Sequence, residues 1–426
     1  MKNSRAGIFL FALFTGLSLR GQDSVTTLAG QPLISGNTNG PLTNALFNDP
    51  AALVADAAGN LFIADTQNHA IRKIGTNGLV STFAGQLGTP GSNNGSGTQA
   101  QFDTPSGIAI ALNGDFYVSD TGNHNIRRIT PLGAVTTIAG MAGQSGSTNA
   151  VGTAARFNSP LGIVVATNGT IYVADCGNHS IRAISPGGAV TTLAGSPETW
   201  GSDDGPGSSA RFNGPVGVAL DSQGNLFVSD SNNDTIRKIT PDGMVSTWAG
   251  VPQVDGCIDG DRLIARFSQP AELAFDKHGS LFVADSFNHV IRKISSDGKV
   301  AIVTGVPGTA GSADGSNGHA RLFNPYGLAI RPDGSLVVVD SYNELIRLVL
   351  VPFKLGIDVF DGNPGAAISW DSVIGKAYQI QHRSGFGFGS WLDLGGPVRA
   401  TNLTTRVIYD IHDPANQRMY RAVVVH

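Results

Sequence analysis

The chain contains 426 residues with a formal net charge of −4 at pH 7, and only 14% of its residues are charged. This composition offers no basic face for a phosphate backbone, which disfavours a nucleic-acid partner. Glycine accounts for 56 residues, above the usual share of about 7%. Because the glycines recur at fixed intervals, they indicate the turns of a folded repeat and argue against disorder.

The first 21 residues have the features of an export signal. Lys2 and Arg5 precede an apolar run from Ala6 to Leu19, and the small residue Gly21 follows where a signal peptidase could cut. The run is shorter than the ~18 or more apolar residues that a membrane-spanning helix needs. We therefore predict a signal peptide over residues 1–21. The mature protein is expected to be secreted or periplasmic and not an integral membrane protein.

Residues 22–352 form a sixfold repeat with a period of 55 residues. Each unit contains the phrase Asp, two residues, Asn, two residues, Ile, Arg. Self-similarity at such a period is typical of stacked supersecondary units that bury their apolar faces on one another. The Asp and Arg residues of the phrase, in chain order, are Asp65 and Arg72, Asp120 and Arg127, Asp175 and Arg182, Asp230 and Arg237, Asp285 and Arg292, and Asp340 and Arg347.

Each unit is predicted to contain four short antiparallel strands. In the second unit these strands fall at residues 107–111, 116–119, 126–129 and 135–139. The sequences between them, such as Asn113-Gly114, are of the turn type and are too short for anything but hairpins. The unit is therefore a four-stranded meander.

The two ends of the repeat distinguish a closed ring from a linear solenoid. Residues 25–30 match the fourth strand of a unit, whereas the sixth unit ends after its third strand. Pairing the first segment with the last unit closes a ring and removes two exposed strand edges. We predict an all-β, six-bladed β-propeller closed by its N-terminal strand.

The repeated Asp and Arg are interpreted as a structural clamp. The Asp ends the second strand, where it can accept hydrogen bonds from the turn that follows, and the Arg returns on the next strand within reach of it. Six copies at identical spacing favour this interpretation, since a single active site does not need six copies.

The phrase Asp-Thr-Gly-Asn-His-Asn-Ile-Arg at residues 120–127, preceded by Pro-Ser-Gly-Ile-Ala at 105–109, resembles the NHL repeat. The resemblance covers about three quarters of the chain and implies a propeller. Members of that family range from protein or RNA binders to a zinc-dependent amidating lyase and lactonase-like enzymes, so the resemblance leaves the activity open. The His of the motif is replaced by Asp234 and Glu344 in the fourth and sixth units.

Function is expected where the repeats differ, and the first difference is a group of acidic residues in two of the long loops between units. The predicted binding residues are Asp203, Asp204, Asp255, Asp259 and Asp261. They would suit a cationic partner or Ca²⁺, although their spacing is not that of a calcium-loop motif and no cofactor is predicted. The alternative is an ordinary solvated loop.

Glu272 is the second difference, because four other units have Gly at the same point of the innermost strand. A lone carboxylate there could bind a metal or act as a base, which makes Glu272 a weak catalytic candidate. A catalytic zinc site needs about three protein ligands, and the innermost strands contain no His. The repeated His residues, such as His124, are expected to be packing groups.

Two further features complete the predictions. Cys176 and Cys257 replace small polar residues at different repeat positions, so a disulfide is not expected.

Residues 353–426 alternate strand-like and turn-like segments and are predicted to form a fibronectin-like β-sandwich accessory domain, with Trp370, Tyr378, Trp391 and Tyr420 in its core.

These observations favour an exported, non-enzymatic propeller that binds a protein or carbohydrate ligand on its long-loop rim. The alternative is a metal-dependent lyase or lactonase-like hydrolase with a site in the central channel.

Overall fold

The computed structural model describes residues 24–316 and 318–350 of the repeat region, and after it the segments 355–359, 365–371, 377–384, 392–393, 395–399, 404–410 and 418–425. The predicted signal peptide lies outside these residues. In the described part of the chain, no helix is long and apolar enough to cross a membrane.

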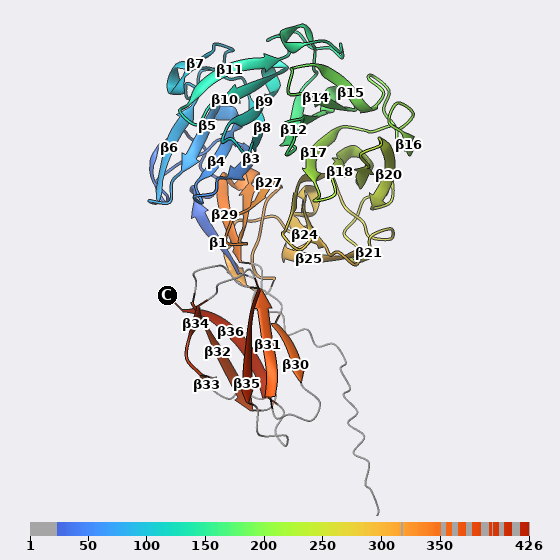
Figure 1. Ribbon diagram of the computed structural model, residues 1–426. Helices are drawn as coiled ribbons and strands as arrows, with labels where there is room; N and C mark the ends of the chain where they lie inside the picture. The colour runs from blue at the N-terminus through green and yellow to red at the C-terminus, as the bar shows by residue number, and fades with distance from the viewer. Residues whose placement is uncertain are drawn as a thin grey trace, which may run out of the picture.

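The repeat forms a six-bladed propeller, which confirms the predicted architecture (Figure 1). The innermost strands are β3 (Pro50–Ala55), β8 (Pro105–Ile110), β12 (Pro160–Val165), β17 (Pro215–Leu220), β22 (Pro270–Phe275) and β27 (Pro325–Ile330). The second strands are β4 (Leu61–Asp65), β9 (Phe116–Asp120), β13 (Ile171–Asp175), β18 (Leu226–Asp230), β23 (Leu281–Asp285) and β28 (Leu336–Asp340). The third strands are β5 (Ala70–Ile74), β10 (Asn125–Ile129), β14 (Ser180–Ile184), β19 (Thr235–Ile239), β24 (Val290–Ile294) and β29 (Leu345–Leu350). The outer strands are β6 (Leu79–Ala84), β11 (Ala134–Ala139), β15 (Val190–Gly195), β20 (Met244–Ala249) and β25 (Lys299–Gly305).

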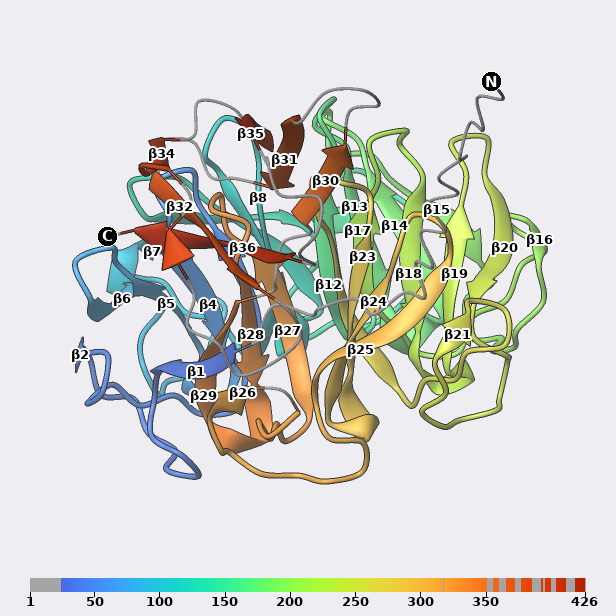
Figure 2. The same ribbon diagram turned by 90° about the horizontal axis from the view of Figure 1, so that it is seen from below.

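The sixth blade takes its outer strand from the start of the chain, as predicted. Strand β1 (Ser24–Ala29) pairs antiparallel with β29, with Val25 opposite Val349. The two strands lie side by side in both views (Figure 1 and Figure 2). Because Val25 and Val349 are buried, closure also completes the apolar core of the last blade.

Five of the six blades have a fifth, two-residue strand that the sequence did not predict. The long loop that leaves one blade runs to the outer edge of the next blade and pairs there before turning inward. These edge strands are β2 (Gly40–Pro41), β7 (Gly95–Ser96), β16 (Gly205–Pro206), β21 (Gly260–Asp261) and β26 (Gly315–Ser316). In the third blade a single bridge between Val151 and Ala189 takes this place. The long loops are therefore built into the sheets.

Each long loop ends in a buried apolar side chain that plugs the space between blades. Phe47, Phe102, Phe157, Phe212, Phe267 and Leu322 are all 0% exposed. Burying a Phe side chain stabilises a fold by roughly 1.5–3 kcal/mol. In five blades the clamp Arg lies over the plug ring; Arg127, for example, is 5.1 Å from the Phe102 centroid.

The repeated Asp and Arg are in contact in every blade and are fully buried. In the first blade, Arg72 Nη1 donates to Asp65 Oδ2 at 2.6 Å and to the Leu46 carbonyl at 3.0 Å, while Nη2 donates to the Thr38 carbonyl at 2.9 Å. The clamp therefore fixes the long loop as well as the hairpin. Burial raises the pKa of Asp65 to about 6, against the opposing effect of Arg72, so the carboxylate stays ionised at neutral pH.

The repeated His residues join neighbouring blades. Every blade has a one-turn 3₁₀ segment between its second and third strands: η1 (Thr66–Asn68), η3 (Thr121–Asn123), η5 (Cys176–Asn178), η6 (Ser231–Asn233), η7 (Ser286–Asn288) and η8 (Ser341–Asn343). In four blades a His follows this segment. Its Nδ1 accepts a backbone N–H of the next blade; Ser159 N–H donates to His124 at 3.0 Å. Asp234 and Glu344 accept the equivalent N–H groups of Gln269 and Asp49. Two further 3₁₀ turns, η2 (Gly97–Gln99) and η4 (Gly152–Ala154), lie in long loops.

After the propeller, the chain forms two antiparallel sheets. One contains β30 (Leu355–Val359), β31 (Gly365–Asp371) and β35 (Thr404–Asp410), and the other contains β32 (Ala377–Ser384), β33 (Leu392–Asp393), β34 (Val398–Arg399) and β36 (Arg418–Val425). These strands agree with the strand-like segments predicted within residues 353–426. The side chains expected in the core of a β-sandwich lie outside those that the structure describes.

Candidate functional site

Two of the five acidic residues predicted to bind a partner already hold a clamp arginine. Asp204 accepts Arg237 Nη2 at 2.6 Å and Asp259 accepts Arg292 Nη2 at 2.7 Å. In the first three blades an Asn takes the same position and the same bond, as Asn149 does with Arg182 at 2.8 Å. The position is thus part of the clamp.

The remaining acidic residues lie at the surface. Asp261 pairs with Lys299 at 2.7 Å, and both side chains are exposed. Asp203 and Asp255 are exposed as well. Among the described residues no group of three or more His, Cys, Asp or Glu side chains is placed to hold a metal ion. A site on these loops stays a prediction that depends mainly on Asp203 and Asp255. Cys176 and Cys257 are both free thiols.

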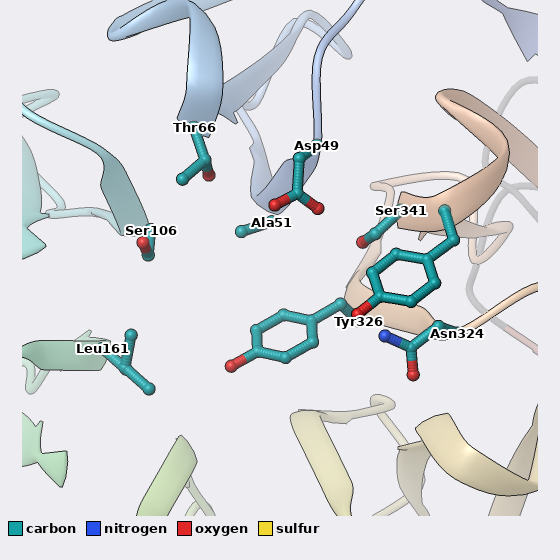
Figure 3. A pocket seen from close by; sticks show the side chains of 9 residues that line it. Asp49, Ala51, Thr66, Ser106, Leu161, Asn324, Tyr326 and Ser341 are labelled. Atoms are coloured by element: carbon teal, nitrogen blue, oxygen red, sulfur yellow. The ribbon is translucent and has the colours of Figure 1, made fainter. Parts of the chain in front are cut away.

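A different site lies at the axis of the ring, where the innermost strands begin. A cavity of about 210 Å³, hereafter the axial cavity, is present there (Figure 3). Its lining residues are Asp49, Ala51, Thr66, Ser106, Leu161, Asn324, Tyr326, Ser341 and Tyr342. They come from the starts of innermost strands and from the one-turn 3₁₀ segments. The repeat therefore builds the frame of the cavity.

Two carboxyl groups meet at the seam where the sixth blade joins the first. The Asp49 N–H donates to Glu344 Oε2 at 2.6 Å. Burial, with a smaller effect of the nearby charges of Asp49 and Asp65, raises the pKa of Glu344 to about 7, against the lowering effect of the hydrogen bond from the Asp49 N–H. Burial also raises the pKa of Asp49, while a hydrogen bond with the Gln67 side chain lowers it. In the part of the chain that the structure describes, neither carboxyl is paired with an Arg or Lys side chain.

Asn324 lines the axial cavity, and the nitrogen of its side-chain amide points toward Tyr326 (Figure 3). Asn324 is 7% exposed, and its side-chain Oδ1 is buried without a hydrogen-bond partner. The backbone is held separately, because the Asn324 N–H donates to His289 Nδ1 at 3.2 Å. Because the Oδ1 is buried, the part of the Asn324 amide that can meet a ligand is its nitrogen, which is a hydrogen-bond donor.

Aromatic side chains gather on the same side of the axial cavity. Figure 3 shows the Tyr326 ring extending from the Asn324 side toward Ser106 and Leu161. Tyr342 also lines the cavity, is 52% exposed, and packs edge to face on Phe323 with centroids 5.2 Å apart. The cavity thus combines a carboxyl group and an amide with aromatic surface on one part of the ring.

Glu272, the weak catalytic candidate, lies near the axial cavity but does not line it. Its side chain is partly buried in β22 and accepts a hydrogen bond from the Leu273 N–H at 3.3 Å. Burial raises its pKa to about 8, and it is close enough to Tyr326 to raise the pKa of that phenol. At Gly217, the same position one blade earlier, a Cβ would collide with the Ala271 carbonyl oxygen. At this repeat position, the space between the fifth and sixth blades holds a side chain, whereas the space between the fourth and fifth blades does not.

Sequence reasoning missed Asp49, Asn324, Tyr326 and Tyr342. The signal that could have found them is the repeat register itself. Tyr326 stands where the other units have Ala51, Ser106, Leu161, Val216 and Ala271. A large polar aromatic at a position that is otherwise small or aliphatic marks a break in the symmetry close to the axis.

Comparison with known proteins places the repeats in a family. The family model described as "NHL repeat" matches residues 102–129, 157–184 and 212–239. The chain is 30% identical over 336 residues to NHL repeat-containing protein 2 of Bos taurus, an alignment that covers 70% of this chain and 46% of that relative. It is 33% identical over 278 residues to Protein SUPPRESSOR OF QUENCHING 1, chloroplastic, of Arabidopsis thaliana, covering 61% of this chain and 26% of that relative. The chain therefore spans less than half the length of these curated relatives.

Solved structures share the fold at low identity. A structural genomics protein of unknown function from Bacteroides thetaiotaomicron superposes with a TM-score of 0.61 at 22% identity, covering 77% of this chain and 76% of that one. An auxiliary nutrient binding protein from Bacteroides ovatus superposes with a TM-score of 0.57 at 17% identity, with coverages of 77% and 76%. At these identities the similarity shows the fold alone.

Proposed function

The repeat region belongs to the NHL-repeat six-bladed β-propeller family, and from this premise we propose that it is a binding module whose ligand occupies the axial cavity. The observation that carries the proposal is the axial cavity itself, where the Tyr326 ring replaces the small or aliphatic residues of the other blades and where the Asp49 carboxyl has no Arg or Lys partner among the described residues. A concave site with aromatic surface and a few convergent polar groups is the usual form of a small-molecule site. The nutrient-binding protein with the same fold is a precedent for binding by this architecture.

This proposal moves the site from the long-loop rim to the axis of the ring. The long loops pair with the neighbouring blade, and two of their predicted binding residues, Asp204 and Asp259, hold clamp arginines. The axial cavity lies on the same face of the propeller, since the loops end where the innermost strands begin. A larger partner could therefore cover both the cavity and Asp203 or Asp255.

The alternative function is an enzyme with a metal-dependent site in the channel. The observation that favours it is the raised pKa of Glu272, about 8, because perturbed carboxyl groups are common in active sites. Glu272 is, however, the only Glu or His on the innermost strands. Binding without chemistry is the simpler proposal.

Export and a C-terminal accessory domain complete the proposal. Residues 1–21 would direct secretion or export to the periplasm, and N-terminal sequencing of the exported protein tests this directly. Residues 353–426 would form a fibronectin-like β-sandwich from the two sheets described above, serving for attachment or spacing. Limited proteolysis that releases a stable propeller of residues 22–352 would support this division.

Ligand-detected NMR with a small-molecule library tests binding at the axial cavity. Tyr326→Ala is expected to remove the signals of cavity ligands. Val216→Ala is the matched control, because it changes the same repeat position on β17, outside the cavity lining. If ligands bind wild type and both variants equally, the site is not the axial cavity.

A further inference from the structure

We propose that the ligand of the axial cavity is an uncharged amphiphile whose apolar tail leaves the cavity over the sixth blade. This inference rests on the proposed binding function and adds the chemical class of the ligand. It follows from an apolar surface beside the cavity, hereafter the apolar lip, which consists of Leu33, Ile34, Phe323 and Tyr342.

The repeat provides five internal comparisons for each residue of the apolar lip, because every unit has the same positions. At the position of Leu33 the other units have Gly88, Gly143, Glu198, Gln253 and Gly308, and at that of Ile34 they have Thr89, Gln144, Thr199, Val254 and Thr309. At the position of Phe323 they have Asn48, Asp103, Asn158, Asn213 and Ser268, and at that of Tyr342 they have Gln67, Gly122, Gly177, Asn232 and Phe287. All but Val254 and Phe287 are polar residues or Gly. The fold of a blade therefore does not require apolar side chains at these positions.

The residues of the apolar lip lie together and reach the axial cavity. The Leu33 N–H donates to the carbonyl of Asn343, the residue after Tyr342, at 3.0 Å. The Tyr342 N–H donates to the Phe323 carbonyl at 3.2 Å, and the two rings pack edge to face. Tyr342 also lines the axial cavity, and Phe323 directly precedes Asn324, another lining residue. The apolar lip is therefore continuous with the cavity.

The apolar lip is exposed, and the fold gains little from it. Leu33 is 66% exposed and Ile34 is 48% exposed. Leu33 also has a φ of 60°, in the left-handed region that favours Gly. A Leu at this point is disfavoured by its backbone and is not compensated by burial. Exposed apolar surface that is grouped in this way is typical of a binding site.

The extent of the apolar lip fits the tail of a small ligand better than a protein surface. A standard protein–protein interface involves about 20–30 residues on each side. The innermost strands of the first and fifth blades flank that of the sixth. In the first blade the equivalent residues are all polar or Gly: Asn48, Gln67, Gly88 and Thr89. In the fifth blade only one of them is apolar: Ser268, Phe287, Gly308 and Thr309. The apolar surface is thus about one blade wide.

The polar end of the ligand is expected to be uncharged and to carry hydroxyl groups. Asp49 brings a carboxylate to the cavity, which repels an anionic head group and accepts hydrogen bonds. The Asn324 amide nitrogen donates hydrogen bonds. A hydroxyl group both donates and accepts, so hydroxyl groups can serve both residues without carrying a charge. The cavity volume of about 210 Å³ lies below the range of about 300–1,000 Å³ that is usual for drug-sized ligands, so the cavity holds the head group and the tail extends over the lip.

Isothermal titration calorimetry of the full chain with alkyl β-glucosides, each below its micelle concentration, tests the proposal. The head group is constant in this series and only the tail grows. A fully buried methylene strengthens binding by up to about fourfold, and a methylene with one side in water by about twofold. Octyl glucoside, with four more methylenes, is therefore expected to bind at least about tenfold more tightly than butyl glucoside. If neither glucoside binds wild type, the inference is wrong.

Variants taken from other units connect the tail to the apolar lip. In the double variant Leu33→Gly/Ile34→Thr, each new residue is the one that three other units have at the same position. This variant should bind butyl glucoside like wild type, while its octyl-to-butyl affinity ratio should fall below about threefold. Val254→Thr is the matched control, because Val254 has the position of Ile34 in the loop over the fourth blade and is 44% exposed. The control should keep the wild-type ratio, and melting curves without ligand check that each variant is folded.

Two further results would overturn the inference in different ways. If Tyr326→Ala removes the binding of both glucosides but the double variant keeps the wild-type ratio, the axial cavity is a binding site whose ligand has no tail on the lip. The proposed function then stands without this inference. If octyl glucoside binds Tyr326→Ala as tightly as wild type and does not bind the double variant, the lip is a site of its own, and both this inference and the proposed function fail.

Discussion

Removing the carboxylate of one clamp should destabilise the whole propeller. Asp175 is fully buried, and its two oxygens accept three hydrogen bonds: from Arg182 Nη1, from Asn178 Nδ2 and from the Asn158 N–H, each at 2.7 Å. Asp175→Ala leaves Arg182 buried with its charge uncompensated. Breaking a buried ion pair by removing one partner costs about 3–5 kcal/mol. At the usual unfolding entropy per residue, this lowers the Tm of a propeller of this size by about 4–7 °C.

Differential scanning calorimetry measures this effect, and two variants sharpen it. Asp175→Asn keeps an acceptor for the Asn158 N–H and should lose less stability than Asp175→Ala. Asp255→Ala removes an exposed acidic side chain and should change the free energy of unfolding by no more than ~0.5 kcal/mol. If Asp175→Ala and Asp255→Ala melt together within about 1 °C, the buried pair does not stabilise the fold and the clamp interpretation is wrong.

Three further predictions concern the seams between blades. Deleting residues 22–31 should lower the Tm strongly, because it exposes the edge of β29; an unchanged melting curve would contradict closure by β1. His124→Ala should cost roughly 0.5–1.5 kcal/mol in urea unfolding because the Ser159 N–H loses its acceptor, whereas His124→Asp should cost less, as Asp234 accepts the equivalent bond naturally. The folded-state pKa of Glu344 is about 7, above its ordinary value of 4.5, so the stabilising contribution of this group is full below about 4.5 and is lost as the pH rises through 7. Melting temperatures from pH 4 to pH 8 should therefore fall more for wild type than for Glu344→Gln, and parallel curves would refute the raised pKa.

The sequence by itself determined the number of blades, the strand positions and the closure of the ring. These features are encoded locally, because alternating apolar residues and hairpin turns recur every 55 residues. The match of residues 25–30 to a fourth strand was enough to predict that β1 pairs with β29. The Phe residues of the plugs also recur at a constant position of the 55-residue repeat, so their burial is encoded in the same local way.

Only the tertiary structure decided what lies between blades. The edge strands are pairs of residues such as Gly95–Ser96, which have no apolar pattern and form only because the next sheet offers an edge. The hydrogen bonds that link each repeated His to the next blade join residues 35 positions apart, such as His124 and Ser159. Asp49 and Glu344 are 295 positions apart and meet only because the ring closes. Periodicity describes what the units share, whereas the candidate site is built from residues that differ between units and come together at the axis, which no single unit contains.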